Sequence, residues 1–234
     1  MNANKTVIES GTSLLLGKVF NEDARWREPL TEFPDGSYAL FRDNDDYCEI
    51  VSDPVASRTI WYYRDEKVFI ASTSQRALVM FIGNFDFEEK VIPWMLSSGT
   101  LGPGLSWDKR IRAVPVDSSV TLNKVDWTFS TRSNSVFFKA ANRSNEQHKK
   151  LLEESLKATF RAVNLDYSHW VLPLSGGYDS RGILCLLSES TDIRRLRTIT
   201  WGLESSRTMK ENDAYVAEEL ANSLRVNHKY YHTD

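Results

Sequence analysis

The sequence predicts a two-part protein that combines α+β and α/β organisation. Short segments of alternating apolar and polar residues, separated by turn-forming residues, fill residues 1–130 and predict a sheet-rich first domain. Over residues 149–234 the pattern becomes strand, loop, helix, strand and helix, which is typical of a parallel sheet. Residues 131–148 contain few apolar side chains and several Ser and Asn residues, which indicates a linker.

The first domain is expected to contain hairpins interrupted by two helices. Apolar residues at helical spacing in Ser74–Ile82 and Phe87–Leu96 predict the helices. Residues 97–104 are rich in glycine and predict a loop, after which Ile111–Leu122 returns to strand-like alternation. The other predicted strands are Thr12–Phe20, Ser37–Phe41, Tyr47–Val51, Thr59–Tyr63 and Lys67–Ser72.

The second domain is expected to begin with a helix over Asn145–Val163. This helix carries Leu151, Leu152, Leu156 and Phe160 at the spacing of one buried stripe. Two strands follow, each succeeded by a helix. The predicted order is strand Trp170–Leu174, helix Arg181–Leu187, strand Leu196–Trp201 and helix Asp213–Leu224.

Length, charge and cysteine content exclude several classes of protein. The chain has 234 residues, of which 41% are hydrophobic and 26% charged, as in ordinary globular proteins. A net charge of −3 argues against nucleic-acid binding, and no apolar run is long enough to suggest a membrane span. The cysteines, Cys48 and Cys185, form no CxxC pattern, which disfavours a disulfide framework or a zinc site and favours a cytoplasmic location.

The most informative segment is Leu174–Arg181, which reads LSGGYDSR and joins a predicted strand to a predicted helix. Small residues at Ser175, Gly176 and Gly177 let the backbone curl and turn its N–H groups inward, which favours a phosphate at the helix N-terminus. The Asp179 carboxylate would repel that phosphate unless Mg²⁺ bridged the two. A plain strand-to-helix turn is the alternative, but the segment is longer than a cap needs and lies where open sheets bind ligands.

Residues 175–180 resemble the SGGxDS pyrophosphate loop of the PP-loop ATP pyrophosphatases. The segment Thr198–Gly202 resembles the second strand of the asparagine synthetase branch of that family, and Asp213 resembles the acidic start of its next helix. The resemblance implies the beginning of a parallel-sheet domain of the adenine nucleotide alpha hydrolase-like class.

The same resemblance implies ATP and Mg²⁺ as cofactors. It places Leu174 and Trp201 beside adenine and Asp179 at Mg²⁺. It assigns the pyrophosphate to Ser175, Gly176, Gly177 and Ser180.

The first domain resembles the later part of the glutaminase domain of class II amidotransferases, which implies an Ntn-hydrolase-like α/β/β/α sandwich. The residues that carry this resemblance are Asp35–Leu40, Asp53, Arg58, Trp61–Tyr63, Ala71–Ser72 and Ala77–Leu78. That family uses an N-terminal Cys as its nucleophile, whereas residue 2 here is Asn2. Asp35 matches the position that binds the glutamine amino group, but the upstream motifs of the family are not found. We therefore expect a degenerate sandwich without glutamine hydrolysis.

The resemblance implies an ATP-dependent ligase that adenylates a carboxylate, releases pyrophosphate and forms an amide. The expected partners are a small-molecule carboxylate and ammonia or an amine donor; no catalytic residue is assigned. Two α/β units do not complete a sheet of this kind, so a missing segment, a second copy or a partner chain is expected to complete it. The alternatives are a truncated, non-catalytic nucleotide-binding subunit and an enzyme similar to β-lactam synthetases or lasso-peptide cyclases.

Three further residues or pairs have open interpretations. Arg181 stands where the family usually has a second Ser, and it either pairs with a phosphate or carboxylate or simply faces solvent. His228 and His232 are four residues apart, but the strand-like sequence around them argues against a metal site. Cys185 is expected to be a small buried residue of its helix.

Overall fold

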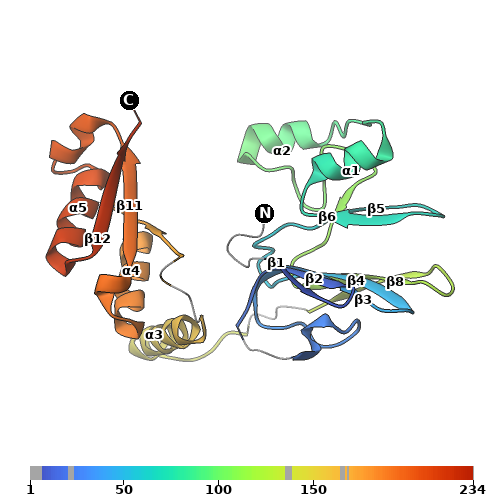
Figure 1. Cartoon of the computed structure of the whole chain (residues 1–234), viewed down its shortest axis with the longest axis horizontal. Helices are drawn as coiled ribbons and strands as arrows, with labels where there is room; N and C mark the ends of the chain where they lie inside the picture. The colour runs from blue at the N-terminus through green and yellow to red at the C-terminus, as the bar shows by residue number, and fades with distance from the viewer. Residues whose placement is uncertain (1–6, 21–23, 135–138, 164–166, 168, 234) are drawn as a thin grey trace. The chain divides into compact units, whose positions relative to one another are not determined.

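A computed structural model describes residues 7–20, 24–134, 139–163, 167 and 169–233. The chain divides into two compact units, residues 1–139 and residues 140–234, which are coloured blue to green and yellow to red in Figure 1. No helix within the described ranges has an apolar run of the length that a bilayer crossing requires.

The first unit is built on a six-stranded antiparallel sheet in the order β1-β2-β3-β4-β8-β9. Four of the eight residues of β3 and four of the six residues of β4 are buried, because both faces of the sheet are covered. The strands are β1 (Val7–Ser10), β2 (Ser13–Val19), β3 (Gly36–Asp43), β4 (Tyr47–Ser52), β8 (Ser118–Asn123) and β9 (Phe129–Ser133).

A smaller three-stranded sheet lies on one face of the large sheet and carries two helices on its other side (Figure 1). Its order is β6-β5-β7, and an apolar cluster that includes Ala39, Ile50, Ile60, Val114 and Val120 joins the two sheets. The elements are β5 (Trp61–Arg64), β6 (Phe69–Ser72), β7 (Arg112–Ala113), α1 (Gln75–Ile82) and α2 (Val91–Ser98).

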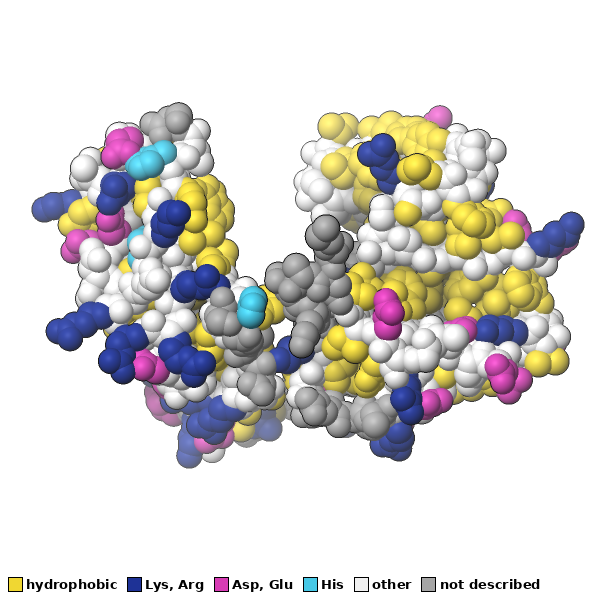
Figure 2. All heavy atoms as spheres, in the orientation of Figure 1, with side chains coloured by type: hydrophobic (Ala, Val, Ile, Leu, Met, Phe, Trp, Pro, Cys, Tyr) yellow, Lys and Arg dark blue, Asp and Glu magenta, His cyan; other side chains and the backbone are white. Residues whose placement is uncertain are grey.

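The α1 and α2 helices leave a broad apolar surface open to solvent within this unit. Figure 2 shows hydrophobic side chains gathered over these helices. The exposed residues include Met80, Phe81, Ile92 and Leu96.

The other face of the large sheet differs from the four-layer expectation. Among the described residues it is covered by the short 3₁₀ helix η1 (Ala24–Arg27) and neighbouring loop residues rather than by a helical layer. Trp26 and Phe33 pack there against Tyr38 and Leu40. These aromatic side chains therefore cover part of this face, whereas α1 and α2 lie on the side of the smaller sheet (Figure 1).

A buried ion pair anchors this aromatic loop to the sheet. The side chains of Arg42 and Glu49 are 0% exposed, and Arg42 Nη1 lies 3.1 Å from Glu49 Oε2. Arg42 also donates to the carbonyl oxygens of Trp26, Thr31 and Glu32, at 2.6–3.2 Å. The guanidinium therefore satisfies the loop's backbone carbonyls while Glu49 balances its charge.

The single strand expected over Ile111–Leu122 is wrong. The structure forms β7 and then β8, separated by a turn in which Pro115 lacks an N–H donor and Asp117 has a left-handed φ of 47°. The Asp117 amide donates to the Asp53 carbonyl oxygen instead of continuing a strand ladder.

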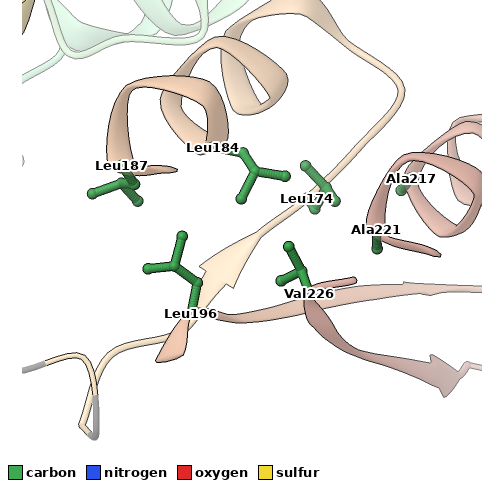
Figure 3. Packing of buried hydrophobic residues seen from close by; sticks show 7 residues of the cluster. All are labelled: Leu174, Leu184, Leu187, Leu196, Ala217, Ala221 and Val226. Carbon is green, nitrogen blue, oxygen red and sulfur yellow. The ribbon is translucent and has the colours of Figure 1, made fainter. Parts of the chain in front are cut away.

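The second unit contains a three-stranded parallel sheet in the order β10-β11-β12. Figure 3 shows the apolar cluster that joins this sheet to α4 and α5, with Leu174, Leu184, Leu196 and Ala217 among its members. The strands are β10 (Leu172–Pro173), β11 (Arg197–Gly202) and β12 (Asn227–His232). The helices are α3 (Asn145–Ala162), α4 (Tyr178–Ser190) and α5 (Asp213–Leu224), with 3₁₀ helices η2 (Ile193–Arg195) and η3 (Glu204–Thr208).

Two burial expectations for this unit are wrong. Within the unit, Leu151, Leu152 and Leu156 of α3 are 42%, 62% and 41% exposed, whereas Phe160 packs against the core. Cys185 is also exposed. Leu184 and Leu187 face the core, and Cys185 lies on a different side of α4.

Candidate nucleotide-binding site

The predicted loop lies at the carboxyl end of the parallel sheet. Leu174, directly after β10, donates its amide to Ile199 O at 2.8 Å, and its carbonyl accepts from Thr200 Oγ1 at 2.5 Å. The helix α4 begins at Tyr178, so residues 175–177 make the whole connection from the sheet to the helix. Two hydrogen bonds thus tie the strand side of the turn to β11.

Ser175 and Ser180 tie the loop together. Ser180 Oγ lies 3.0 Å from Ser175 Oγ and accepts from the Ser175 amide at the same distance. The Gly177 amide donates to Ser175 Oγ at 3.2 Å. The two hydroxyls, expected as phosphate donors, therefore bond first to each other and to the loop backbone.

The first turn of α4 has no side-chain cap. Its N-cap residue is Gly177, with φ −69° and ψ 154°, and no side chain of the described residues caps the helix by accepting from its first-turn amides. By contrast, Ser144 caps α3 and Asn212 caps α5 through side-chain hydrogen bonds. Backbone donors at the start of α4 are thus available to an anionic ligand, and the helix dipole favours negative charge there.

Gly176 has no side chain because another part of the unit lies very close to it. From the sequence, a glycine is instead expected here for the backbone conformation. A Cβ atom at this position would lie 2.5 Å from Asp213 Oδ1 and 2.9 Å from Asp213 Cα. Neither Gly176 nor Gly177 has a left-handed φ. The start of α5 therefore packs directly on the loop, and it brings the Asp213 carboxylate beside Gly176.

Asp179 is exposed in the first turn of α4. Within the described ranges no three His, Cys, Asp or Glu side chains are grouped as a metal site. Mg²⁺ commonly uses one or two carboxylates together with substrate phosphates, so the carboxylates at this loop fit that ion only when a nucleotide is bound as well.

Trp201 and Leu174 have different environments. Trp201 lies near the end of β11 and is 58% exposed. Since β10 and β11 are parallel, Trp201 lies at the same carboxyl end of the sheet as the loop. Leu174 is 2% exposed and belongs to the core cluster, so its side chain packs into the core beneath the loop.

His228 and His232 have separate partners on β12. His228 Nδ1 lies 2.9 Å from Thr198 Oγ1, whereas His232 Nδ1 lies 2.6 Å from Glu204 Oε2. Burial lowers the pKa of His228, and its Nε2 atom is buried without a hydrogen-bond partner among the residues that the structure describes. The two imidazoles do not converge on a metal site.

Asp35 lies in the first unit, on the wall of a small hollow of about 160 Å³. The residues around it belong to the aromatic loop that Arg42 anchors. They are Arg25, Trp26, Thr31, Glu32, Phe33 and Pro34.

These features define the second unit as a parallel α/β unit with an uncapped, glycine-containing loop suited to phosphate. Residues 150–234 match the family model described as asparagine synthase, which supports that family for this part of the chain. The loop, Trp201 and Asp213 all lie inside the matched region.

Among solved structures, the chain is similar to glutamine phosphoribosylpyrophosphate amidotransferase from B. subtilis, complexed with ADP and GMP, with 8% identity and a TM-score of 0.33. The similarity covers 95% of this chain and 46% of the amidotransferase, so the chain spans less than half of that protein's length. No curated protein matches the chain.

Proposed function

We propose that the chain acts as an asparagine-synthetase-like, ATP-dependent ligase that forms an amide bond. The observation that carries this proposal is the LSGGYDSR loop at the carboxyl end of β10, inside the region that matches the asparagine synthase family. The proposed substrates are ATP, a small-molecule carboxylate, and ammonia or an amine. The carboxylate would be adenylated with release of pyrophosphate before the amide forms.

Each loop residue has a proposed role. The backbone amides of Gly176 and of the uncapped first turn of α4 bind pyrophosphate oxygens, and the Ser175–Ser180 pair holds the loop in shape and contributes its hydroxyls. Asp179 holds Mg²⁺, which supplies positive charge to the leaving pyrophosphate. The exposed ring of Trp201 provides a flat apolar surface for adenine at the same carboxyl end of the sheet.

Exchange of labelled pyrophosphate into ATP, with Mg²⁺ and a panel of carboxylates, tests the proposal. We expect exchange by the unaltered chain and a loss of at least about a hundredfold in Asp179→Ala, since that carboxylate is the proposed metal ligand. The matched control is Glu219→Ala, which removes an exposed carboxylate from α5. Equal exchange in both variants would contradict the role of Asp179.

We also propose that the first unit does not hydrolyse glutamine. Its cysteine, Cys48, lies within β4, and burial raises the pKa of the thiol to about 11, which disfavours a thiolate nucleophile. Asn2, which follows Met1, lies outside the described residues. Release of ammonia from glutamine by the purified chain would overturn this proposal.

A non-catalytic nucleotide-binding chain is the second candidate. In the described part of the chain, β10 has a strand neighbour only on its β11 side, so one edge of the parallel sheet is open to a further segment or a partner chain. This candidate expects ATP binding without pyrophosphate exchange. The ligase proposal expects both, so the same two measurements separate them. Acceptors such as those of β-lactam synthetases or lasso-peptide cyclases are tested by the substrate panel, and a cytoplasmic location remains part of the proposal.

A further inference from the structure

We propose that Arg181 is a ligand-binding residue of this loop and that it binds the polyphosphate of the nucleotide. This inference rests on the proposed nucleotide-binding function and adds a specificity-determining contact to it. It chooses between two interpretations that the sequence leaves open, an anion-binding arginine and a solvent-facing one.

The Arg181 side chain folds back onto the beginning of its own helix. Its Nε donates to Gly177 O at 3.2 Å, and its Cζ lies 4.7 Å from the centre of the Tyr178 ring. Tyr178 itself is 86% exposed, so its ring is a platform for the guanidinium rather than part of the core. These two contacts hold the planar group beside the loop and restrict the rotamers that a free surface arginine would sample.

Arg181 places a cation at the end of the helix that disfavours positive charge. A helix N-terminus carries partial positive charge, which disfavours a cation there. Within the described residues no Asp or Glu forms an ion pair with Arg181, although Asp179 occupies the same helical turn. The guanidinium and the uncapped amides of α4 therefore lie at the same loop, where the Asp179 and Asp213 carboxylates supply the nearby negative charge without pairing with Arg181.

The remaining donors suit a phosphate group. The Nε atom is used by Gly177 O, which leaves the two terminal NH₂ groups of the fork for a ligand. A guanidinium fork matches the spacing of phosphate oxygens, and hydrogen bonds between charged groups are stronger than neutral ones. A carboxylate offers a similar pair of oxygens. Residues 175–180, directly before Arg181, carry the pyrophosphate motif, so the polyphosphate is the anion we assign.

Affinities of the full chain for ATP, AMP and inorganic pyrophosphate, measured by calorimetry with Mg²⁺, test the inference. In Arg181→Ala we expect ATP and pyrophosphate to bind at least about tenfold more weakly, with AMP nearly unchanged. Arg181→Lys keeps the charge but lacks the fork, so its ATP affinity should fall between those of Arg181→Ala and the unaltered chain. The matched control is Arg194→Ala, which removes an exposed arginine that pairs with Asp192 on η2.

The outcomes separate this inference from the function on which it rests. If the unaltered chain binds ATP and Arg181→Ala binds it equally well, the inference fails and the proposed function stands. If Arg181→Ala weakens ATP and AMP by the same factor, Arg181 maintains the fold or contacts a part that both nucleotides share, and does not contact the β- and γ-phosphates, which also overturns the inference. If the unaltered chain binds neither ATP nor pyrophosphate, both fail.

Discussion

Gly176→Ala tests whether the start of α5 braces the candidate loop. The new methyl group would lie 2.5 Å from Asp213 Oδ1 and 2.9 Å from Asp213 Cα, whereas ordinary contacts begin near 3.4 Å. The side-chain oxygen can rotate away, but the Cα atom belongs to the backbone, so the loop or the first turn of α5 must move. Overpacking of this kind typically costs about 1–3 kcal/mol of unfolding free energy.

Gly182→Ala is the matched control. A Cβ at Gly182 meets nothing within 4 Å, and the residue lies inside α4. Alanine there should stabilise the second unit by about 0.5–1 kcal/mol, because it raises helix propensity. The two substitutions insert the same methyl group six residues apart and should have opposite signs.

Thermal unfolding followed by far-UV circular dichroism measures both variants. The second unit dominates this signal, since its helices have 18, 13 and 12 residues whereas α1 and α2 have 8 each. Each kcal/mol should move the midpoint by roughly 4–8 °C in a unit of this size. Gly176→Ala should also weaken ATP binding, and adding Asp213→Ala should restore only part of the lost stability. A Gly176→Ala midpoint equal to or above that of the unaltered chain would refute the reasoning.

Three further predictions concern the two cores. Glu49→Gln leaves the buried Arg42 guanidinium without a counter-charge, so urea unfolding of the first unit should show a loss of about 3–5 kcal/mol; a loss below about 1 kcal/mol would contradict this account. Burial lowers the pKa of His228 from 6.5, so its contribution to stability is fully present above pH 6.5 and is lost as the pH falls toward and through the folded-state pKa, with a slope of at most about 1.4 kcal/mol per pH unit. His228→Asn should flatten that part of the stability profile, and an unchanged profile would exclude His228 as its source. Leu184→Ala empties a fully buried site and should cost about 3–5 kcal/mol in chemical denaturation, whereas Leu152→Ala, on an exposed position of α3, should change stability by less than about 0.5 kcal/mol.

Elements with strong local signals were predictable from the sequence. The helix expected over Asp213–Leu224 has those bounds in the structure, because its apolar stripe and the Asn212 cap both act within a few residues. The Pro115 turn was missed because alternation of apolar residues continues across it, and the left-handed Asp117 backbone has no strong sequence signal.

Burial on α3 and α4 was harder to predict. An apolar stripe shows which face of a helix can be covered, but not what covers it, so Leu151 and Leu152 were assigned to a core that does not reach them in their own unit. Cys185 was judged by its residue type, although Leu184 and Leu187 already define the buried side of α4.

The candidate site was only partly predictable for the same reason. The SGGxDS pattern locates the loop, but the contact between Gly176 and Asp213 joins residues 37 positions apart and depends on where α5 begins. The packing of Arg181 on Tyr178 depends on side-chain rotamers and is visible only in the structure.

The separation of the apolar clusters has a consequence for how such a chain can evolve. One cluster lies wholly within residues 140–234, and two lie wholly within residues 1–139. Recombination at the boundary would exchange the phosphate-loop half for another sequence without opening either cluster of the sheet-rich half. Each half can therefore accumulate substitutions in its own interior without compensating changes in the interior of the other.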